Sequence, residues 1–355
     1  MWLAPLSALG LPGWVSFLLT VLTIAGIYAL LALGLNIHYG FTGLINFGHV
    51  AFFAAGAYTA AILTMPPPGQ VSGAEYLVGG NLPMPLGLPI SLGAATLVGG
   101  ALAACIGLTS VRLGSHYLAI ATFALAGIFS SILENEAWLT NGSFGLNQVP
   151  KPGRAAMAAD VWQLAYLALV VAAVLAVVAI LSRLTGSPFG RLLKGVRESE
   201  DAARMLGKDT VRVKLTSFAI GGAVAGLAGG LYAHYVGSVV TQQFVPAVTF
   251  TVWAGMLLGG VASNTGAVFG AVLIVGFRES TRFLTSAYDS ILAALPTVLA
   301  DVIRAVVVPL PDHASFVPSL RFVVVGVLIV LVIRYRPEGV FGDPHEVDAI
   351  GEEES

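Results

Sequence analysis

Charged residues are scarce in this chain of 355 residues and make up only 10% of it. Soluble domains typically carry about 25% charged residues, whereas here 57% of the residues are hydrophobic. An excess of positive charge is also missing, because the formal net charge is -2, so nothing suggests a nucleic-acid partner. The composition therefore indicates an integral membrane protein.

Cysteine is nearly absent as well, since Cys105 is the one cysteine and lies in an apolar run. A single thiol can form neither a disulfide framework nor a cysteine-based metal site within one chain. The histidines lack the HxxxH or HExxH spacing of a metal site, and no Gly-x-x-x-x-Gly-Lys-Ser/Thr loop is present to cradle phosphates. We therefore expect no metal, no cofactor and no enzymatic activity on this chain.

Long apolar stretches are what the sequence has in quantity. A helix needs about 20 residues to cross about 30 Å of hydrocarbon. The segments that meet this criterion are 14–36, 44–65, 86–110, 115–133, 161–184 and 215–236, with a last one near 320–333. The first of them lacks a basic flank and is too long for a signal-peptide core, so we expect it to be a retained span.

The pattern predicts an all-α integral membrane protein, a polytopic helical bundle of about 8–10 membrane helices. It would form one transmembrane domain over residues 1–342. Residues 343–355 carry six acidic and no basic side chains, which favours a disordered cytoplasmic tail.

The stretch 247–277 is interrupted by the Gly-rich sequence 259–266. The break leaves two apolar arms of about a dozen residues each, which is too short for either to span alone. Irregular backbone at membrane depth is tolerated where it is buried in protein, so we expect a broken or re-entrant helix pair. The alternative is one crossing here and another at 291–308, where the apolar period favours an interfacial amphipathic helix instead.

A polar island at 187–214 holds seven of the 17 basic residues. Because Lys and Arg concentrate in cytoplasmic loops, the island is expected inside, with the loops 66–85 and 135–160 outside. Arg334 and Arg336 then place the C-terminus in the cytoplasm. We expect a multi-pass protein of the cell inner membrane.

Within the island, local signals predict two short helices. Ser187 followed by Pro188 can start the first, and Ser199 can cap a second that opens with acidic residues and stops at Gly207. A capped helix so short, standing out of the membrane, favours a docking element over a merely charged loop.

The second apolar stretch carries polar groups that should not face lipid. Such groups usually face the bundle interior or a cavity. The His49 ring could instead form a hydrogen bond with a neighbouring carbonyl. The candidate translocation-pathway residues are Thr42, Asn46, Gly48, His49, Tyr58 and Asn264.

Two motifs carry a family resemblance. The string Gly40, Thr42, Gly43, Gly48, His49, Phe52, Gly56, Ala57 and Tyr58 resembles the opening signature of the permease subunits of branched-chain amino-acid ABC importers. Asp201-Ala202-Ala203-x-x-x-Gly207 resembles the coupling motif of ABC-importer permeases, with Asp in place of Glu. The stretches 115–123 and 140–146 look like the M-type subunit of that family.

The resemblance implies an ATP-driven importer of leucine, isoleucine and valine, with urea, short amides or other amino acids as alternatives. It implies an H-type permease subunit, two ATP-binding cassette ATPase subunits that bind ATP and Mg, and an external solute-binding protein, besides membrane lipid. An ion-coupled secondary transporter is disfavoured, because charged residues are nearly absent from the clear spans. The implied ATPase-coupling residues are Arg191, Arg197, Glu198, Ser199, Glu200, Asp201, Ala202, Ala203 and Gly207.

Overall fold

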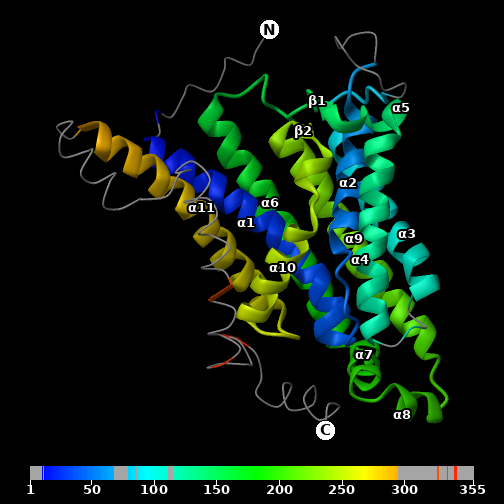
Figure 1. The fold of residues 1–355 in the computed structure, drawn as a ribbon. Coiled ribbons are helices and arrows are strands. Elements are labelled where there is room, and N and C mark those ends of the chain that lie inside the picture. The colour runs from blue at the N-terminus through cyan, green and yellow to red at the C-terminus, as the bar shows by residue number, and fades with distance from the viewer. Residues whose placement is uncertain are drawn as a thin grey trace, which may run out of the picture.

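The computed structural model describes residues 12–294 apart from 68–78, 85, 111–112 and 114, together with residues 10, 326–327, 334 and 340–341. Within this part of the chain, eight helices form a bundle, as predicted (Figure 1). They are α1 (Gly13–Asn36), α2 (His49–Thr64), α3 (Gly87–Ser110), α4 (Ser115–Asn135), α6 (Ala159–Thr185), α9 (Thr210–Val236), α10 (Pro246–Gly259) and α11 (Asn264–Ala294).

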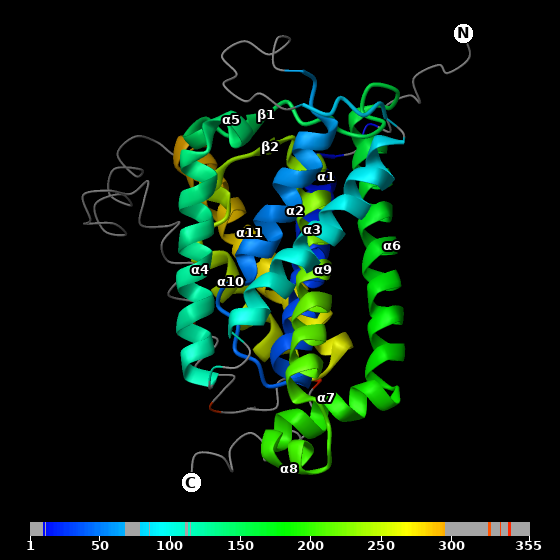
Figure 2. The same cartoon turned by 90° about the vertical axis from the view of Figure 1, so that its right-hand side faces the viewer.

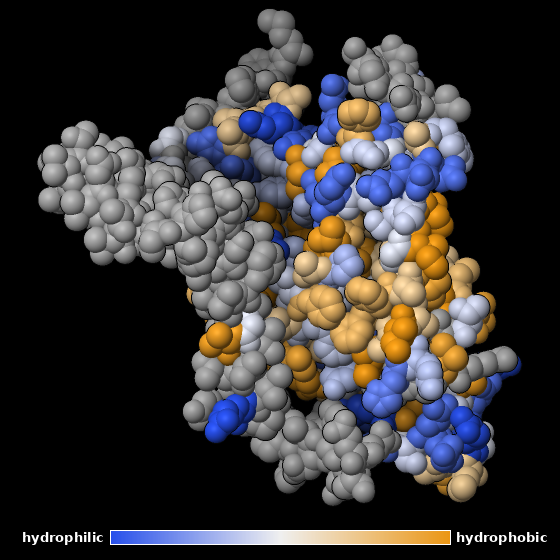
Figure 3. Space-filling model, viewed as in Figure 1, coloured by the Kyte–Doolittle hydropathy of each residue, from blue (hydrophilic) through white to orange (hydrophobic). Residues whose placement is uncertain are grey.

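The bundle has the dimensions and surface of a membrane protein. Among the described residues, the segments containing α1, α3, α4, α6 and α9 are long and apolar enough to cross a bilayer, and they match the predicted spans. Apolar side chains cover the middle of the face in Figure 3, while polar side chains gather towards its two ends. This distribution is expected of a chain whose middle contacts lipid.

Helix α9 packs against both α2 and α3 near the centre of the bundle. The three helices approach at Gly226, where a Cβ on Gly56 or Gly99 would overlap the backbone of α9. Small residues of this kind let membrane helices approach closely without a hydrophobic driving force. Close backbone contact is therefore the basis of this part of the core.

The second apolar stretch differs from the predicted span 44–65. The chain leaves α1 through a π-helical turn, η1 (Ile37–Phe41), and stays non-helical until α2 begins at His49. Gly43 has φ +73°, a conformation that interrupts a helix and favours glycine. The interruption is tolerated because side chains of neighbouring elements satisfy its backbone groups, as described below.

The predicted broken pair is confirmed in position, because α10 ends at Gly259 and α11 begins at Asn264. Its second arm is much longer than the dozen residues expected, since α11 runs for 31 residues to Ala294. The polar residues Arg278 and Glu279 that end the apolar run are accommodated by hydrogen bonds, so the helix continues through them. Residues 343–355 and most of the segments 320–333 and 291–308 lie outside the described residues.

The two ends of the bundle carry different peripheral structures (Figures 1 and 2). At one end are the short helices α7 (Pro188–Glu198) and α8 (Glu200–Met205). At the other end are α5 (Ala137–Thr140), η3 (Gly142–Phe144), η4 (Thr241–Gln243), and strands β1 (Leu146–Asn147) and β2 (Ser238–Val239). The strands pair antiparallel, with Leu146 opposite Val239, a small β element that the all-helical prediction missed.

We expect Gly226→Ala to lower the free energy of unfolding by about 3 kcal/mol, because its Cβ would force α3 away from α9. Gly93→Ala in α3 is the matched control, since its Cβ meets open space. Thermal unfolding of the purified protein in detergent measures both. Equal midpoints for the two variants would contradict close packing at Gly226.

Candidate docking hairpin and buried polar cluster

The polar island folds into a helical hairpin with the predicted caps. The Ser187 Oγ accepts a hydrogen bond from the Phe189 N–H at 3.2 Å, and the Ser199 Oγ accepts one from the Ala202 N–H at 3.2 Å. Gly207, with φ +74°, donates its N–H to the Arg204 carbonyl at 2.9 Å and thereby ends the hairpin. The signals read from the sequence are thus confirmed for local structure.

Glu200 joins α8 to the start of α9. Its carboxylate forms an ion pair with Lys214 and accepts hydrogen bonds from the Thr210 hydroxyl at 3.0 Å and from Arg204 at 2.9 Å. Partial burial alone would raise the pKa of this carboxyl, but the bonds from Lys214, Thr210 and Arg204 hold the pKa below its ordinary value. The hairpin is therefore fixed to the membrane domain at its base.

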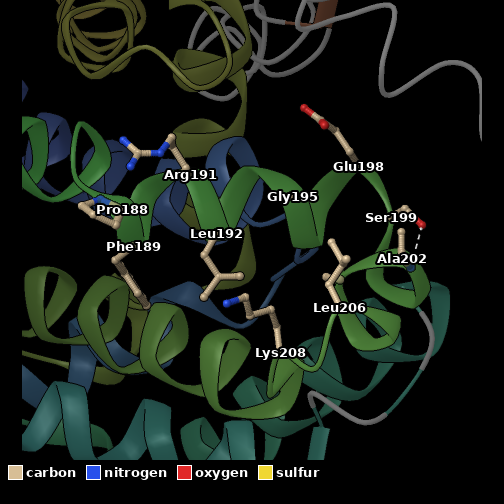
Figure 4. A pocket seen from close by; sticks show the side chains of 11 residues that line it. Pro188, Phe189, Arg191, Leu192, Gly195, Glu198, Ser199, Ala202, Leu206 and Lys208 are labelled. Carbon is tan, nitrogen blue, oxygen red and sulfur yellow. Dashed lines mark hydrogen bonds between the residues drawn. The ribbon is translucent and has the colours of Figure 1, made fainter.

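A groove of ≈ 640 Å³ lies between α7 and α8 (Figure 4). Phe189, Leu192 and Leu206 point into it, and Arg191 and Glu198 also line it, with side chains that extend towards the other side of α7. Leu206 in the groove is 78% exposed, and Met205 beside it is 87% exposed. Apolar side chains this exposed, on an otherwise polar hairpin, suit contact with another protein.

The predicted coupling residues do not all belong to this surface. Arg191, Glu198, Ser199, Ala202 and Ala203 line the groove, and the Asp201 side chain is 81% exposed.

Arg197 instead turns into the bundle and donates a hydrogen bond from its guanidinium to the Gly40 carbonyl. The sequence reasoning missed the exposed Met205 and Leu206. A six-residue helix can bury only a short face, which here is Ala203. Its length could therefore have indicated that Met205 and the following Leu206 are exposed.

Four of the predicted pathway residues, Thr42, Asn46, Gly48 and His49, lie in a buried polar cluster at the α1–α2 junction. The Asn46 amide contacts the His38 ring Nδ1 at 3.1 Å and accepts the Gly48 N–H at 2.8 Å. The Thr42 hydroxyl lies 2.7 Å from that of Ser217 in α9. Thr42, Asn46 and His49 are each at most 2% exposed, and protein groups bond the Thr42 hydroxyl and the Asn46 amide.

Histidine 49 completes the cluster. Its Nε2 lies 3.1 Å from the Leu31 carbonyl oxygen of α1. This contact matches the alternative considered from the sequence, in which the His49 ring bonds a neighbouring carbonyl. Its ring packs edge to face with His38, with 5.4 Å between the ring centroids. Within the described part of the chain, no group of three or more His, Cys, Asp or Glu residues could hold a metal ion.

The other predicted pathway residues lie elsewhere. The Tyr58 hydroxyl lies 3.3 Å from Thr241. The Asn264 side chain accepts a 3.5 Å bond from Asn36 and donates a 3.4 Å bond to Ser182. The six residues therefore do not form one site. His38, Ser217 and Asn36 were missed, because their role depends on contacts between distant segments.

A buried ionic group also escaped the sequence reasoning. In α11, Arg278 donates to Glu279 at 3.1 Å and to the Tyr28 hydroxyl of α1 at 3.0 Å. Glu279 is only 6% exposed. The group lies beyond the stretch 247–277 to which that helix pair was assigned, and it joins α11 to α1.

The fold defines a polytopic helical membrane protein that carries a peripheral helical hairpin, α7–α8. The chain belongs to the family described as the permease component of the branched-chain amino acid transport system, whose family model matches residues 17–333.

Several relatives share parts of this sequence. The chain is 34% identical over 284 residues to the high-affinity branched-chain amino acid permease LivM of Escherichia coli K12, covering 74% of this chain and 63% of that protein. It is 25% identical over 335 residues to the probable LivM of Methanocaldococcus jannaschii, covering 88% and 90%. It is also 25% identical over 350 residues to LivH of Salmonella typhimurium, covering 92% and 95%. No solved structure matches.

We expect Asn46→Ala to lower the free energy of unfolding by about 2 to 4 kcal/mol, because it leaves His38 and the Gly48 N–H without their partner in a buried site. Thr59→Ala in α2 is the control, since its hydroxyl bonds only the Ala55 carbonyl of its own helix. Thermal unfolding in detergent compares them. A loss for Asn46→Ala no larger than the control would indicate that water reaches Asn46.

We expect Glu200→Gln to speed amide exchange in residues 200–206 several-fold at pH 7. A carboxyl with a lowered pKa stabilises the fold above its unfolded pKa of about 4.3 and loses this effect as pH falls through its folded pKa. The difference between variant and wild type should therefore vanish at lower pH. Hydrogen exchange by mass spectrometry measures it, with the exposed Asp201→Asn as control.

Proposed function

We propose that this chain is the translocating permease subunit of an ATP-driven ABC importer. The observation that carries the proposal is the α7–α8 hairpin, with its groove, its exposed Leu206 and its serine caps, in a chain of this permease family. A short helix held at its base and exposed at its tip is suited to receive force from another protein. Its neighbours in sequence, α6 and α9, are long membrane helices that would move with it.

ATP and Mg would bind to partner subunits. The sequence contains no Gly-x-x-x-x-Gly-Lys-Ser/Thr loop, so we assign hydrolysis to two ATP-binding cassette subunits that dock on the hairpin. Closure of those subunits would push α7 and α8, and the membrane helices would alternate between inward-open and outward-open packings. An H-type permease subunit would form the other half of the pathway, in line with the similarity to both LivM and LivH proteins.

Branched-chain amino acids are the proposed solutes, because the similar LivM proteins carry that description. An external binding protein would deliver them at the end of the bundle that bears β1 and β2. The basic residues of the hairpin support an orientation with α7 and α8 in the cytoplasm of a cell that has this protein in its inner membrane. Arg334 and Arg336 support a cytoplasmic C-terminus in the same way.

Purified complexes reconstituted in liposomes test the transport class. We expect uptake of leucine, isoleucine and valine to require ATP, the ATPase subunits and the binding protein. Competition between these amino acids and urea or short amides for the binding protein tests the solute. Uptake driven by an ion gradient without ATPase subunits would overturn the proposal.

We expect Leu206→Asp to weaken binding of the ATPase subunits by at least about tenfold, because it places a charge on an apolar contact surface. Leu113→Asp is the matched control, since Leu113 is another exposed leucine, 41% exposed, in the turn between α3 and α4. Copurification and titration of the ATPase with each variant measure the effect. Equal binding by both variants would show that α8 is not the docking surface.

A further inference from the structure

One cationic side chain of α7 contacts the membrane domain on the side of the helix away from the groove. Arg197 donates a hydrogen bond from its guanidinium to the carbonyl oxygen of Gly40 in η1. Its side chain also packs on Gly43, where an added Cβ would lie 3.1 Å from the Arg197 Cγ. One turn earlier, the Lys194 ammonium lies 5.9 Å from the centre of the Phe41 ring. Three contacts thus connect α7 to the turn that follows α1.

This turn needs such a donor. The last carbonyls of a helix have no partner within the helix, and here the chain goes on without regular hydrogen bonding until His49. A charged donor makes a stronger hydrogen bond to such a carbonyl than a neutral one does. Arg197 therefore supplies the hydrogen bond to the Gly40 carbonyl that water would supply outside a membrane.

The turn in question connects several helices. Ser217 of α9 donates to the Ile37 carbonyl at 3.1 Å, so α9 is joined to the turn directly. The Trp253 indole of α10 donates to the Asn46 carbonyl at 3.1 Å. The Ala262 N–H, between α10 and α11, donates to the Asn36 side chain at 2.9 Å. A displacement of the segment from Asn36 to Asn46, which contains η1, would thus reach α1, α2, α9 and the α10–α11 pair together.

We propose that Arg197 is a positioning residue that transmits movement of the α7–α8 hairpin to the α1–α2 junction. The route runs from the groove through α7 to Gly40, and from there into the buried polar cluster. This inference rests on the proposed function, in which partner ATPases move the hairpin. It assigns Arg197 a role inside the chain, with docking left to the groove and the tip of α8.

Three variants of the complete complex in liposomes test the inference: Arg197→Ala, Arg197→Lys, and Arg212→Ala as a control. The Arg212 side chain is 85% exposed and pairs with Asp209, so it reports on loss of charge in the same segment. The measurements are the amount of ATPase bound, the rate of ATP hydrolysis, and the solute moved for each ATP hydrolysed.

For Arg197→Ala, we expect ATPase binding and hydrolysis within about twofold of wild type, and solute moved per ATP lowered by about tenfold or more, as loss of a charged hydrogen bond predicts. Arg197→Lys should restore part of this ratio, because an ammonium can still donate to the Gly40 carbonyl. Arg212→Ala should match wild type in all three measurements.

Unchanged solute moved per ATP in Arg197→Ala would overturn the inference, and so would a loss of ATPase binding in proportion to the loss of transport. Both results would leave the proposed function standing, whereas a wild-type complex that binds no ATPase would overturn the proposed function itself. If Arg197→Ala fails to insert, Arg197→Met decides. It keeps much of the aliphatic side chain and removes the donor to the Gly40 carbonyl, so a normal transport ratio there overturns the inference and a lowered one supports it.

Discussion

The rest of this structure depends on satisfying the backbone between α1 and α2 without water. Irregular backbone that is buried in protein cannot bond to bulk water, so its polar groups need partners from the protein. Here the partners are side chains: Ser217 on the Ile37 carbonyl, Trp253 on the Asn46 carbonyl, and Arg197 on the Gly40 carbonyl. They come from α9, α10 and α7, and this one junction therefore fixes the relative positions of four membrane helices.

At this junction, the close packing of helices and the hydrogen bonds of the buried polar groups depend on the same contacts. The His38 ring lies against Gly221 of α9, where a Cβ would overlap the ring, and this approach lets its Nε2 reach the Phe218 carbonyl at 3.1 Å. The opposite ring nitrogen contacts Asn46, which in turn accepts the Gly48 N–H at the start of α2. A larger residue at position 221 would thus separate both the helices and the hydrogen-bonded chain.

Local signals in the sequence were sufficient to predict the elements that depend only on residues close together in the chain. Hydropathy located α1, α3, α4, α6 and α9, and Ser187, Ser199 and Gly207 located the hairpin, because caps act within a few residues. The sequence could not indicate that Thr42 meets Ser217, since that pairing depends on how α9 is placed. The length of α11 was also underestimated, because Arg278 and Glu279 indicate the end of an apolar run. Only the structure shows that Arg278 bonds both Glu279 and Tyr28 of α1.

The two sides of α7 explain why a helix, and not a loop, stands between the groove and the bundle. Leu193 and Val196 are buried against the membrane domain, while Leu192 lines the groove. A helix keeps these sides in fixed relation through its own hydrogen bonds, whereas an irregular loop could deform under load. With Arg197 at its last turn attached to Gly40, displacement of the groove by a partner must either move the α1–α2 junction or break that contact.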